Sequence, residues 1–322
     1  MSPDLPPALR RAIDREMAGV SRQTMAERTA ATTTAYRAGG TSASTIRGRD
    51  DALAYALARL PATYAACAEV FSETMRTVPG FAPTSLLDAG CGPGGGSWAA
   101  VEAWPALSAV TWLDANPPFL DLAQRLAGDS PLSAATVQRG DLVAGSYPAA
   151  DLVLASYALA EIAPASQGQV VTHLWDACRG VLALVEPGTP AGYSRILAAR
   201  EILIAAGALL VAPCPHHNAC PLIEPDWCHF GVRLARSRDH RLAKGAEVPY
   251  EDEKFAYLLA ARPGLAVAPR QSRILDRPRV GKPGINLKLC GPDGLTHRFA
   301  AKRNKPDHAI ARRLDWGDVW PD

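Results

Sequence analysis

The chain has 322 residues, of which 48% are hydrophobic and 20% charged, and this composition is typical of a globular protein with one large domain or two modest ones. No apolar run approaches the roughly 18 residues that a membrane-spanning helix needs, so we expect no membrane association. The N-terminus lacks the apolar core of a signal peptide, and its acidic residues are unusual for a transit peptide. These features predict a cytoplasmic protein whose thiols stay reduced.

The net charge of +2 is small, but it is unevenly distributed. Between Arg270 and Arg313 the chain carries twelve Lys or Arg and only three acidic residues, so the remainder is acidic overall. A basic end on an acidic protein indicates a surface that faces a polyanion. A solvated basic face without a partner is the alternative interpretation.

Residues 1–80 are predicted to form a helical region. Two segments, Ala52–Leu60 and Tyr64–Met75, carry apolar residues at spacings of three and four. The run Ala38–Ser44 interrupts this pattern with two consecutive Gly, which predicts a loop.

Residues 81–210 alternate between short apolar runs and helical patterns. The predicted strands are Thr84–Leu87, Ala109–Leu113, Ala135–Gln138, Asp151–Ala155 and Val181–Val185. The predicted helices are Ser97–Ala103, Phe119–Leu126, Gln167–Arg179 and Tyr193–Ala206. This order predicts an α/β fold, in which a Rossmann-like parallel sheet is covered by helices on both faces.

Residues 211–322 are less regular, and residues 211–229 are rich in Pro, Cys and His. We expect a helix over Lys254–Ala261. Two further strands, Ser272–Leu275 and Ile285–Leu289, are suited to closing the edge of the sheet. The basic residues lie in this same region, which we expect to face RNA.

A glycine loop joins the first predicted strand to the first helix of the α/β core. The strand ends in Asp88, and Gly90, Gly92 and Gly94 follow before the helix. Glycines let a ligand approach the backbone, and a helix N-terminus attracts a carboxylate or phosphate. The spacing also fits a dinucleotide fingerprint, so NAD binding and a structural turn are alternatives.

The run Leu87-Asp88-Ala89-Gly90-Cys91-Gly92 resembles the first motif of class I S-adenosylmethionine methyltransferases. The resemblance implies that Asp88 and the loop glycines hold the amino-acid end of S-adenosylmethionine. It also implies that Asp114 binds the ribose hydroxyls and that Asp141 reaches the adenine amine. We add Ser156, at the exit of the fourth strand, to the cofactor-binding positions.

No catalytic residue is assigned. Asn116-Pro117-Pro118-Phe119 resembles an amino-group methyltransferase motif, but it follows the second strand instead of the fourth, so we interpret it as the start of a helix. Tyr157 could stack on a base, although core packing is favoured, and Glu161 is interpreted as a surface helix residue. Catalysis therefore stays an open question.

The seven cysteines fall into two groups. Three are interpreted as small buried residues: Cys67, Cys91 and Cys178. Four can converge from irregular backbone and indicate an iron–sulfur cluster or zinc, with no metal as a further alternative: Cys214, Cys220, Cys228 and Cys290. Their gaps differ from the paired knuckles of a zinc ribbon. Histidines that could replace one thiol in a zinc site are His216, His217, His229 and His297.

The assembled pattern resembles the mitochondrial small-ribosomal-subunit methyltransferase-like family and its bacterial relatives. The resemblance rests on Cys214-Pro215-His216, Cys220-Pro221, Asp226-Trp227-Cys228-His229-Phe230, Glu186-Pro187-Gly188-Thr189-Pro190 and Cys290, and it covers roughly residues 50–320.

This family resemblance implies a class I methyltransferase fold with a Cys-rich metal-binding insertion. The expected partner is the rRNA of the small ribosomal subunit, and the expected metal group is a 4Fe–4S cluster on Cys214, Cys220, Cys228 and Cys290. A non-catalytic RNA-binding assembly factor with a structural zinc site is the alternative. A radical enzyme is least favoured, because a fourth Cys would leave no iron free for the cofactor. We expect a monomer.

Overall fold

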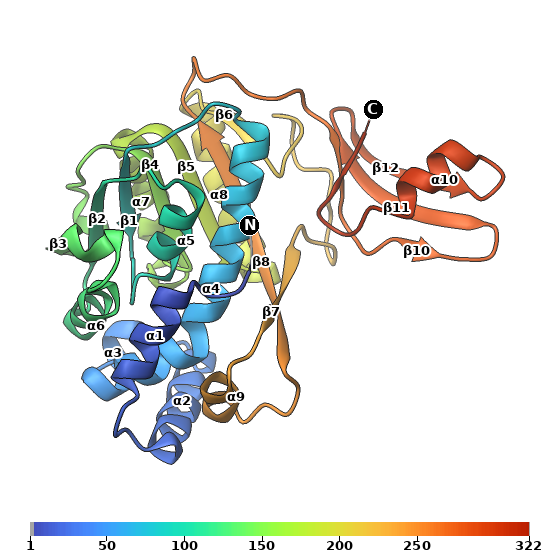
Figure 1. Ribbon diagram of the computed structural model, residues 1–322. Coiled ribbons are helices and arrows are strands. Elements are labelled where there is room, and N and C mark those ends of the chain that lie inside the picture. The colour runs from blue at the N-terminus through green and yellow to red at the C-terminus, as the bar shows by residue number, and fades with distance from the viewer. Residues whose placement is uncertain (1–2, 322) are drawn as a thin grey trace.

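The computed structural model describes residues 3–321, and its largest element is a mixed eight-stranded sheet (Figure 1). The strand order is β3-β2-β1-β4-β5-β8-β6, with β7 paired to β8. The first five strands are parallel, as predicted, and β8 runs antiparallel to β5 and β6. The strands are β1 (Ser85–Ala89), β2 (Ala109–Asp114), β3 (Thr136–Arg139), β4 (Ala150–Ser156), β5 (Cys178–Pro187), β6 (Leu209–Ala212), β7 (Phe230–Ala235) and β8 (Tyr250–Ala261).

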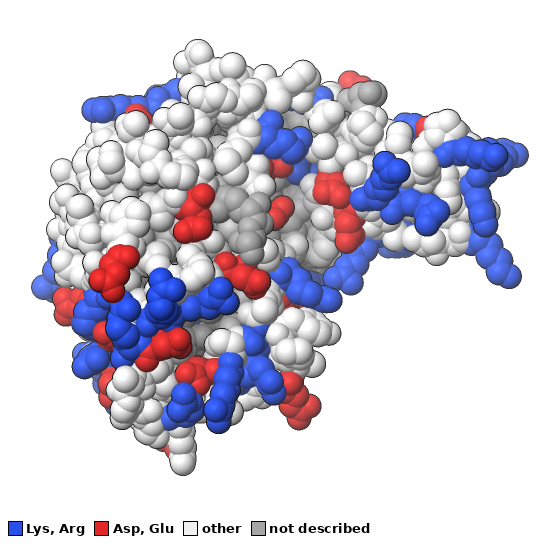
Figure 2. Space-filling model, viewed as in Figure 1, with Lys and Arg blue, Asp and Glu red and all other residues white. Residues whose placement is uncertain are grey.

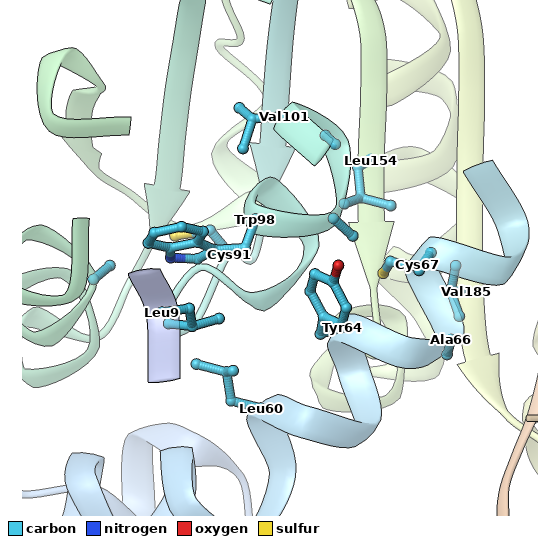
Figure 3. Packing of buried hydrophobic residues seen from close by; sticks show 14 of the residues in the cluster. Leu9, Leu60, Tyr64, Ala66, Cys67, Cys91, Trp98, Val101, Leu154 and Val185 are labelled. Atoms are coloured by element: carbon cyan, nitrogen blue, oxygen red, sulfur yellow. The ribbon is translucent and has the colours of Figure 1, made fainter. Parts of the chain in front are cut away.

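Helices cover both faces of this sheet, which confirms the predicted α/β Rossmann-like fold. Successive strand residues point to opposite faces, so Leu86 packs in one buried cluster and Leu87 in the other. The helices on the Leu86 side are α4 (Arg49–Thr77), α5 (Gly95–Ala103) and α6 (Pro117–Ala127), and those on the Leu87 side are α7 (Pro164–Ala177) and α8 (Pro190–Ala205). Figure 3 shows the first cluster, where Leu60 and Trp98 lie with Leu154.

The N-terminal helices precede this core. They are α1 (Pro7–Glu16), α2 (Arg22–Arg37), the single turn α3 (Ser42–Thr45) and α4. The two helical segments predicted between residues 52 and 75 are parts of the one helix α4. The loop predicted over Ala38–Ser44 is wrong at its end, because α3 begins at Ser42. Along residues 3–321, no helix is long and apolar enough to cross a membrane.

The helix predicted over Lys254–Ala261 is wrong, because these residues belong to strand β8. Every residue from Phe255 to Ala261 is buried, since β8 lies between β5 and β6 in the sheet and is covered on both faces. A short run that is apolar on both sides has no periodicity that separates a buried strand from a helix.

The two strands predicted to close the sheet edge lie instead in a second, five-stranded sheet. This sheet and α10 (Lys305–Ala311) form the C-terminal lobe, residues 272–320, which extends away from the α/β core (Figure 1). Its strands are β9 (Ser272–Ile274), β10 (Arg279–Val280), β11 (Gly284–Gly291), β12 (Gly294–Ala301) and β13 (Val319–Trp320). Figure 2 shows Lys and Arg gathered on this lobe.

Strands β7 and β8 form a long hairpin whose tip carries α9 (Arg238–Lys244). The tip reaches α2, where the Nε of Arg22 donates to Oδ1 of Asp239 at 2.7 Å. The hairpin thereby connects the N-terminal helices to β8, which continues into the eight-stranded sheet beside β5.

Candidate functional site

The glycine loop leaves β1 and enters α5 with three residues at positive φ. These are Gly90 at 74°, Gly92 at 52° and Gly94 at 86°, a region that side chains strongly disfavour. A side chain at position 90 would also clash, because a Cβ on Gly90 would lie 2.7 Å from the Cβ of Ala158. The loop therefore brings its backbone to the carboxyl end of the sheet with no side chain at these three positions.

Asp88 lies beneath this loop and is fully buried. Its Oδ2 accepts from the Oγ of Ser97 at 2.6 Å, and the Nε1 of Trp112 donates to the same hydroxyl at 3.0 Å. Burial raises the pKa of Asp88 to about 7. Its Oδ1 has no hydrogen-bond partner among the described residues. Asp88 thus connects β1 to α5 from below.

A pocket of about 190 Å³ lies above the loop and brings together five of the seven predicted cofactor residues. These are Gly90, Gly92, Asp114, Asp141 and Ser156. Asp88 and Gly94 are not among the lining residues, because Asp88 is buried below and Gly94 faces Trp112.

The two pocket aspartates hold backbone groups. The carboxylate of Asp114 accepts from the N–H of Gly92 and of Asn116, both at 2.8 Å, and burial raises its pKa. Asp141 accepts from the N–H of Val143 at 2.8 Å. Asn116 caps α6 as predicted, so the Asn-Pro-Pro run is the start of a helix.

The turn α3 and the residues before it cover the pocket, since Thr41, Ser42 and Ala43 line it. The N–H and Oγ of Ser42 donate to Oε2 of Glu161 at 3.0 and 2.5 Å, and the hydroxyl of Tyr36 donates to Oε1 at 3.0 Å. The interpretation of Glu161 as a surface residue is therefore wrong. The local sequence contains no signal for this role, because its partners lie more than 100 positions away.

Tyr157 lies between this pocket and a second cavity of about 320 Å³, and it lines both. Its φ of 58° is the only positive value among the non-glycine residues of the described part of the chain. Such a conformation costs about 1–3 kcal/mol. The hydroxyl of Tyr157 donates to Oε1 of Glu253 at 2.7 Å. Core packing, the favoured interpretation of Tyr157, is therefore only part of its role.

All four cysteines of the predicted metal site line one small cavity of about 40 Å³ beside α8. Burial raises the pKa of the Cys214 and Cys228 thiols, and it raises that of Cys290 to about 12. Within residues 3–321, no three His, Cys, Asp or Glu side chains come close enough together to hold a single ion. The other three cysteines are buried, as predicted: Cys67, Cys91 and Cys178.

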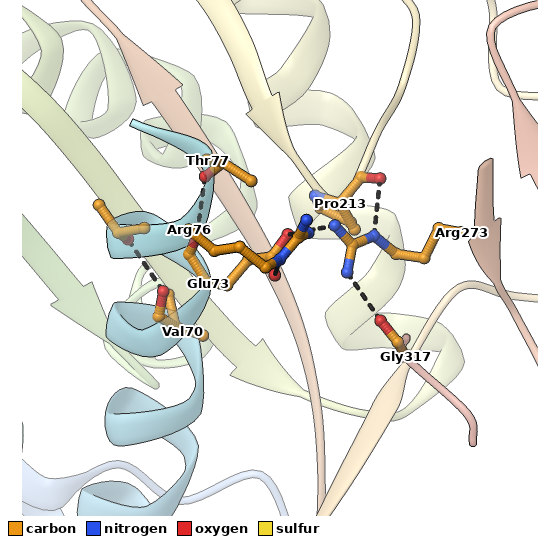
Figure 4. Close-up of polar contacts among 8 residues, drawn as sticks. Val70, Glu73, Arg76, Thr77, Pro213, Arg273 and Gly317 are labelled. Atoms are coloured by element: carbon orange, nitrogen blue, oxygen red, sulfur yellow. Dashed lines mark hydrogen bonds and ion pairs between the residues drawn. The ribbon is translucent and has the colours of Figure 1, made fainter. Parts of the chain in front are cut away.

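Two buried arginines flank the cysteine cavity. Arg200 is 1% exposed, and its Nη2 donates to the carbonyls of His216 and Asn218 at 3.0 and 2.5 Å. Arg273, on β9, donates to the carbonyls of Pro213 and Gly317 and to the carboxylate of Glu73 on α4 (Figure 4). Arg273 therefore joins the core, the C-terminal lobe and the cysteine loop, which is the segment 213–229 that carries three of the four cysteines. The sequence pattern assigned it only to a basic surface.

Several of the other cations in the C-terminal region are paired. Arg298 contacts Asp307 at 2.8 Å, and Arg279 contacts Asp276 at 3.3 Å. A groove of about 510 Å³ between β10 and α10 is lined by further basic residues, which are Lys282, Lys302, His308 and Arg312.

Comparison with known protein families shows which family this chain belongs to. The family described as mitochondrial small ribosomal subunit Rsm22 matches residues 49–321. The chain belongs to this family. The human mitochondrial ribosome assembly protein METTL17 is 30% identical over a 292-residue alignment that covers 84% of this chain and 62% of the relative. A mitochondrial Rsm22-cox11 tandem protein of Schizosaccharomyces pombe is 26% identical over 73% of this chain and 38% of the relative.

This Rsm22-family chain therefore spans less than two thirds of the relatives' length. The predicted cytoplasmic location is wrong by this comparison, because the family and these relatives are described as mitochondrial.

Solved structures similar to the chain include several methyltransferases. A putative RNA methyltransferase from Pyrococcus horikoshii has a TM-score of 0.43 at 11% identity and covers 62% of this chain and 82% of that one. Magnesium protoporphyrin IX methyltransferase from Synechocystis, with bound S-adenosylmethionine, has a TM-score of 0.41 at 17% identity and covers 62% of this chain and 80% of that one.

Proposed function

We propose that this protein binds S-adenosylmethionine at the glycine loop and small-subunit rRNA through its C-terminal lobe, and that it acts in assembly of the small ribosomal subunit. The observation that carries the proposal is the single pocket that gathers residues following β1, β2, β3 and β4. In α/β sheets, ligands bind at the carboxyl ends of the strands. The role in assembly is inferred from the human relative, which is named a mitochondrial ribosome assembly protein.

The pocket residues fit the cofactor by their chemistry. Gly90 and Gly92 allow close approach to the backbone, and the carboxylates of Asp114 and Asp141 are acceptors for ribose hydroxyls and an adenine amine. Titration calorimetry with S-adenosylmethionine and with NAD tests this assignment. We expect Asp114→Asn to weaken S-adenosylmethionine binding about tenfold, the effect of a lost charged hydrogen bond. Asp121→Asn, on the exposed face of α6, is the matched control. Tighter binding of NAD would contradict the assignment.

A 4Fe–4S cluster on Cys214, Cys220, Cys228 and Cys290 is part of the proposal. The donor set fits, because four thiols line one cavity, and the buried cations Arg200 and Arg273 beside it offset the negative charge of thiolate ligands. When bound, the cluster would supply a cross-link between the cysteine loop and β11. We expect a coloured protein with iron and sulfide in equal amounts. A colourless protein that contains only zinc would refute the cluster.

Catalysis is tested separately from binding. Assembling small subunits are incubated with the protein and S-adenosylmethionine labelled on its methyl group, and any labelled nucleotide is mapped. Label that is lost with Asp88→Asn would establish an enzyme. Binding without labelled RNA would assign the protein as a non-catalytic assembly factor.

A further inference from the structure

The second cavity contains groups that cofactor binding leaves unused. Its volume of about 320 Å³ is at the lower end of the range of small-ligand sites, which is roughly 300–1,000 Å³. It shares four lining residues with the cofactor pocket, namely Thr41, Tyr55, Tyr157 and Glu161. A ligand in this cavity would therefore lie beside a ligand in the pocket.

Three aromatic side chains contribute to the walls of the cavity. Tyr36, Tyr55 and Tyr157 all line it, and the rings of Tyr36 and Tyr55 lie 6.3 Å apart at 45°. Rings that are held at an angle and fixed by surrounding contacts suit a planar ligand that stacks on one of them. Unpaired nucleobases are bound in this way by proteins that read or modify them.

Two charged groups in the cavity have unused hydrogen-bonding capacity. Oε1 of Glu253 accepts from Tyr157, whereas Oε2 has no hydrogen-bond partner in residues 3–321. Over the same part of the chain, the guanidinium of Arg59 makes neither a hydrogen bond nor an ion pair, although it interacts electrostatically with Glu253. The cavity therefore offers an unused carboxylate oxygen of Glu253 beside the donors of Arg59, whereas both oxygens of Glu161 already accept hydrogen bonds.

This pattern distinguishes the amine-bearing bases from uracil. Cytosine and adenine each present an amine donor next to a ring nitrogen acceptor, and this order matches Glu253 and Arg59. Guanine presents its amine and N1–H to a carboxylate and its O6 to a guanidinium, so it matches as well. Uracil presents a carbonyl oxygen where cytosine has its amine, and a carboxylate repels that oxygen. A Lys or Arg side chain from a protein fits less well, because it presents donors only and would leave the donors of Arg59 without an acceptor.

The backbone of Tyr157 supports a ligand-binding role. Its N–H donates to the carbonyl of Val185 at 2.7 Å, so the β4–β5 ladder continues to this residue. The chain then adopts a positive φ, and the ring lines both cavities. Strained conformations of this kind cluster at ligand sites, where surrounding contacts hold them.

We propose that the second cavity receives one unpaired, amine-bearing nucleobase, with its amine at Glu253 and its acceptor atom at Arg59. The inference rests on the proposed function, because the cavity shares four lining residues with the proposed cofactor pocket, so the base would lie beside S-adenosylmethionine. Methyl transfer would form an N–C bond from the amine nitrogen while the C–S bond breaks with its electrons on sulfur. The amine proton would pass to Glu253. Burial raises the pKa of Glu253, which suits this carboxylate to accept a proton.

The test compares two single-stranded RNA probes of equal charge, pentacytidylate and pentauridylate, titrated calorimetrically into the full chain with S-adenosylhomocysteine present. Phosphate contacts are common to both probes, so a difference in affinity isolates base recognition. We expect pentacytidylate to bind about tenfold more tightly, the effect of one hydrogen bond to a charged group. Glu253→Gln and, independently, Arg59→Gln should abolish the preference. Asp252→Asn, one residue away and paired with Arg233 at the surface, should keep it.

The outcomes separate the two proposals. If S-adenosylhomocysteine does not bind the wild-type chain, the proposed function and this inference both fail. If it binds but the two RNAs bind equally, or if both variants retain the preference, the inference alone is overturned. Saturable binding of N-acetyl-arginine amide that is lost in Glu253→Gln, without a preference between the RNAs, would assign the cavity to a protein side chain instead.

Discussion

The α/β core and the C-terminal lobe are stabilised in different ways. The core buries apolar side chains on both faces of its sheet, in two large clusters. The lobe has fewer than 50 residues and one small cluster, whose fully buried members are Ile274, Ile285, Leu287, Leu289, Ala300, Ala311 and Trp320. Domains below roughly 70 residues rarely gain more than a few kcal/mol from a core of this size.

This difference indicates how the C-terminal lobe, the proposed RNA-binding surface, is held in place. The lobe is attached to the rest of the protein beside the cysteine cavity and by Arg273, which reaches across to Glu73 on α4 (Figure 4). The proposed metal group would supply stability that a small core lacks, and the buried ion pair fixes where the lobe attaches. The basic lobe is therefore expected to depend on contacts made outside it, whereas the proposed cofactor pocket depends on the core.

The largest expected effect comes from removing one proposed cluster ligand. We expect Cys228→Ser to abolish RNA binding at physiological salt and to remove hydrogen-exchange protection from residues 272–320, while S-adenosylhomocysteine affinity is unchanged. Exchange mass spectrometry and RNA binding measure these effects. Cys178→Ser, a buried thiol in the core, is the control and should leave the lobe protected. A protected, RNA-binding lobe in metal-free Cys228→Ser would contradict the structural role of the cluster.

A smaller effect is expected from Glu73→Gln, which leaves the buried guanidinium of Arg273 without its carboxylate. Breaking such a pair typically costs about 3–5 kcal/mol. We expect this loss in the local opening free energy of the lobe, measured by native-state hydrogen exchange. In the control, Asp276→Asn removes an exposed pair with Arg279, and the expected cost is below about 1 kcal/mol. Equal costs for the two variants would show that Arg273 does not attach the lobe.

The smallest predicted effect concerns the core and its pH dependence. The pKa of Asp88 is about 7 in the folded protein, above its ordinary value of 3.8, so the folded state holds the proton more tightly between these values. Asp88 therefore lowers the free energy of unfolding as pH rises through that window, by up to about 1.4 kcal/mol per unit.

Denaturant unfolding at about pH 5 and about pH 8 measures this slope. Asp88→Asn should flatten it, whereas Asp121→Asn on the surface of α6 should not. The same slope in wild type and Asp88→Asn would contradict a buried, proton-holding Asp88.

Local patterns in the sequence were sufficient to predict much of the α/β core. The alternation of apolar runs predicts β1 to β5, and the glycine spacing predicts the loop, because both depend on contacts between neighbouring residues. The cysteine pattern likewise indicates the four thiols that the fold brings to one cavity.

Only the tertiary structure decided the features that depend on residues far apart in the chain. Strand β8 is indistinguishable from a buried helix until its neighbours β5 and β6 are known, and β9 and β11 enter a second sheet by pairing with each other. The sequence around Glu161, Tyr157 and Glu253 contains no motif that indicates a shared site. These residues line one cavity because α3 and the β7–β8 hairpin both pack against the end of β4. Residue type and spacing therefore determine which chemical groups are present, whereas long-range packing determines which of them share a cavity.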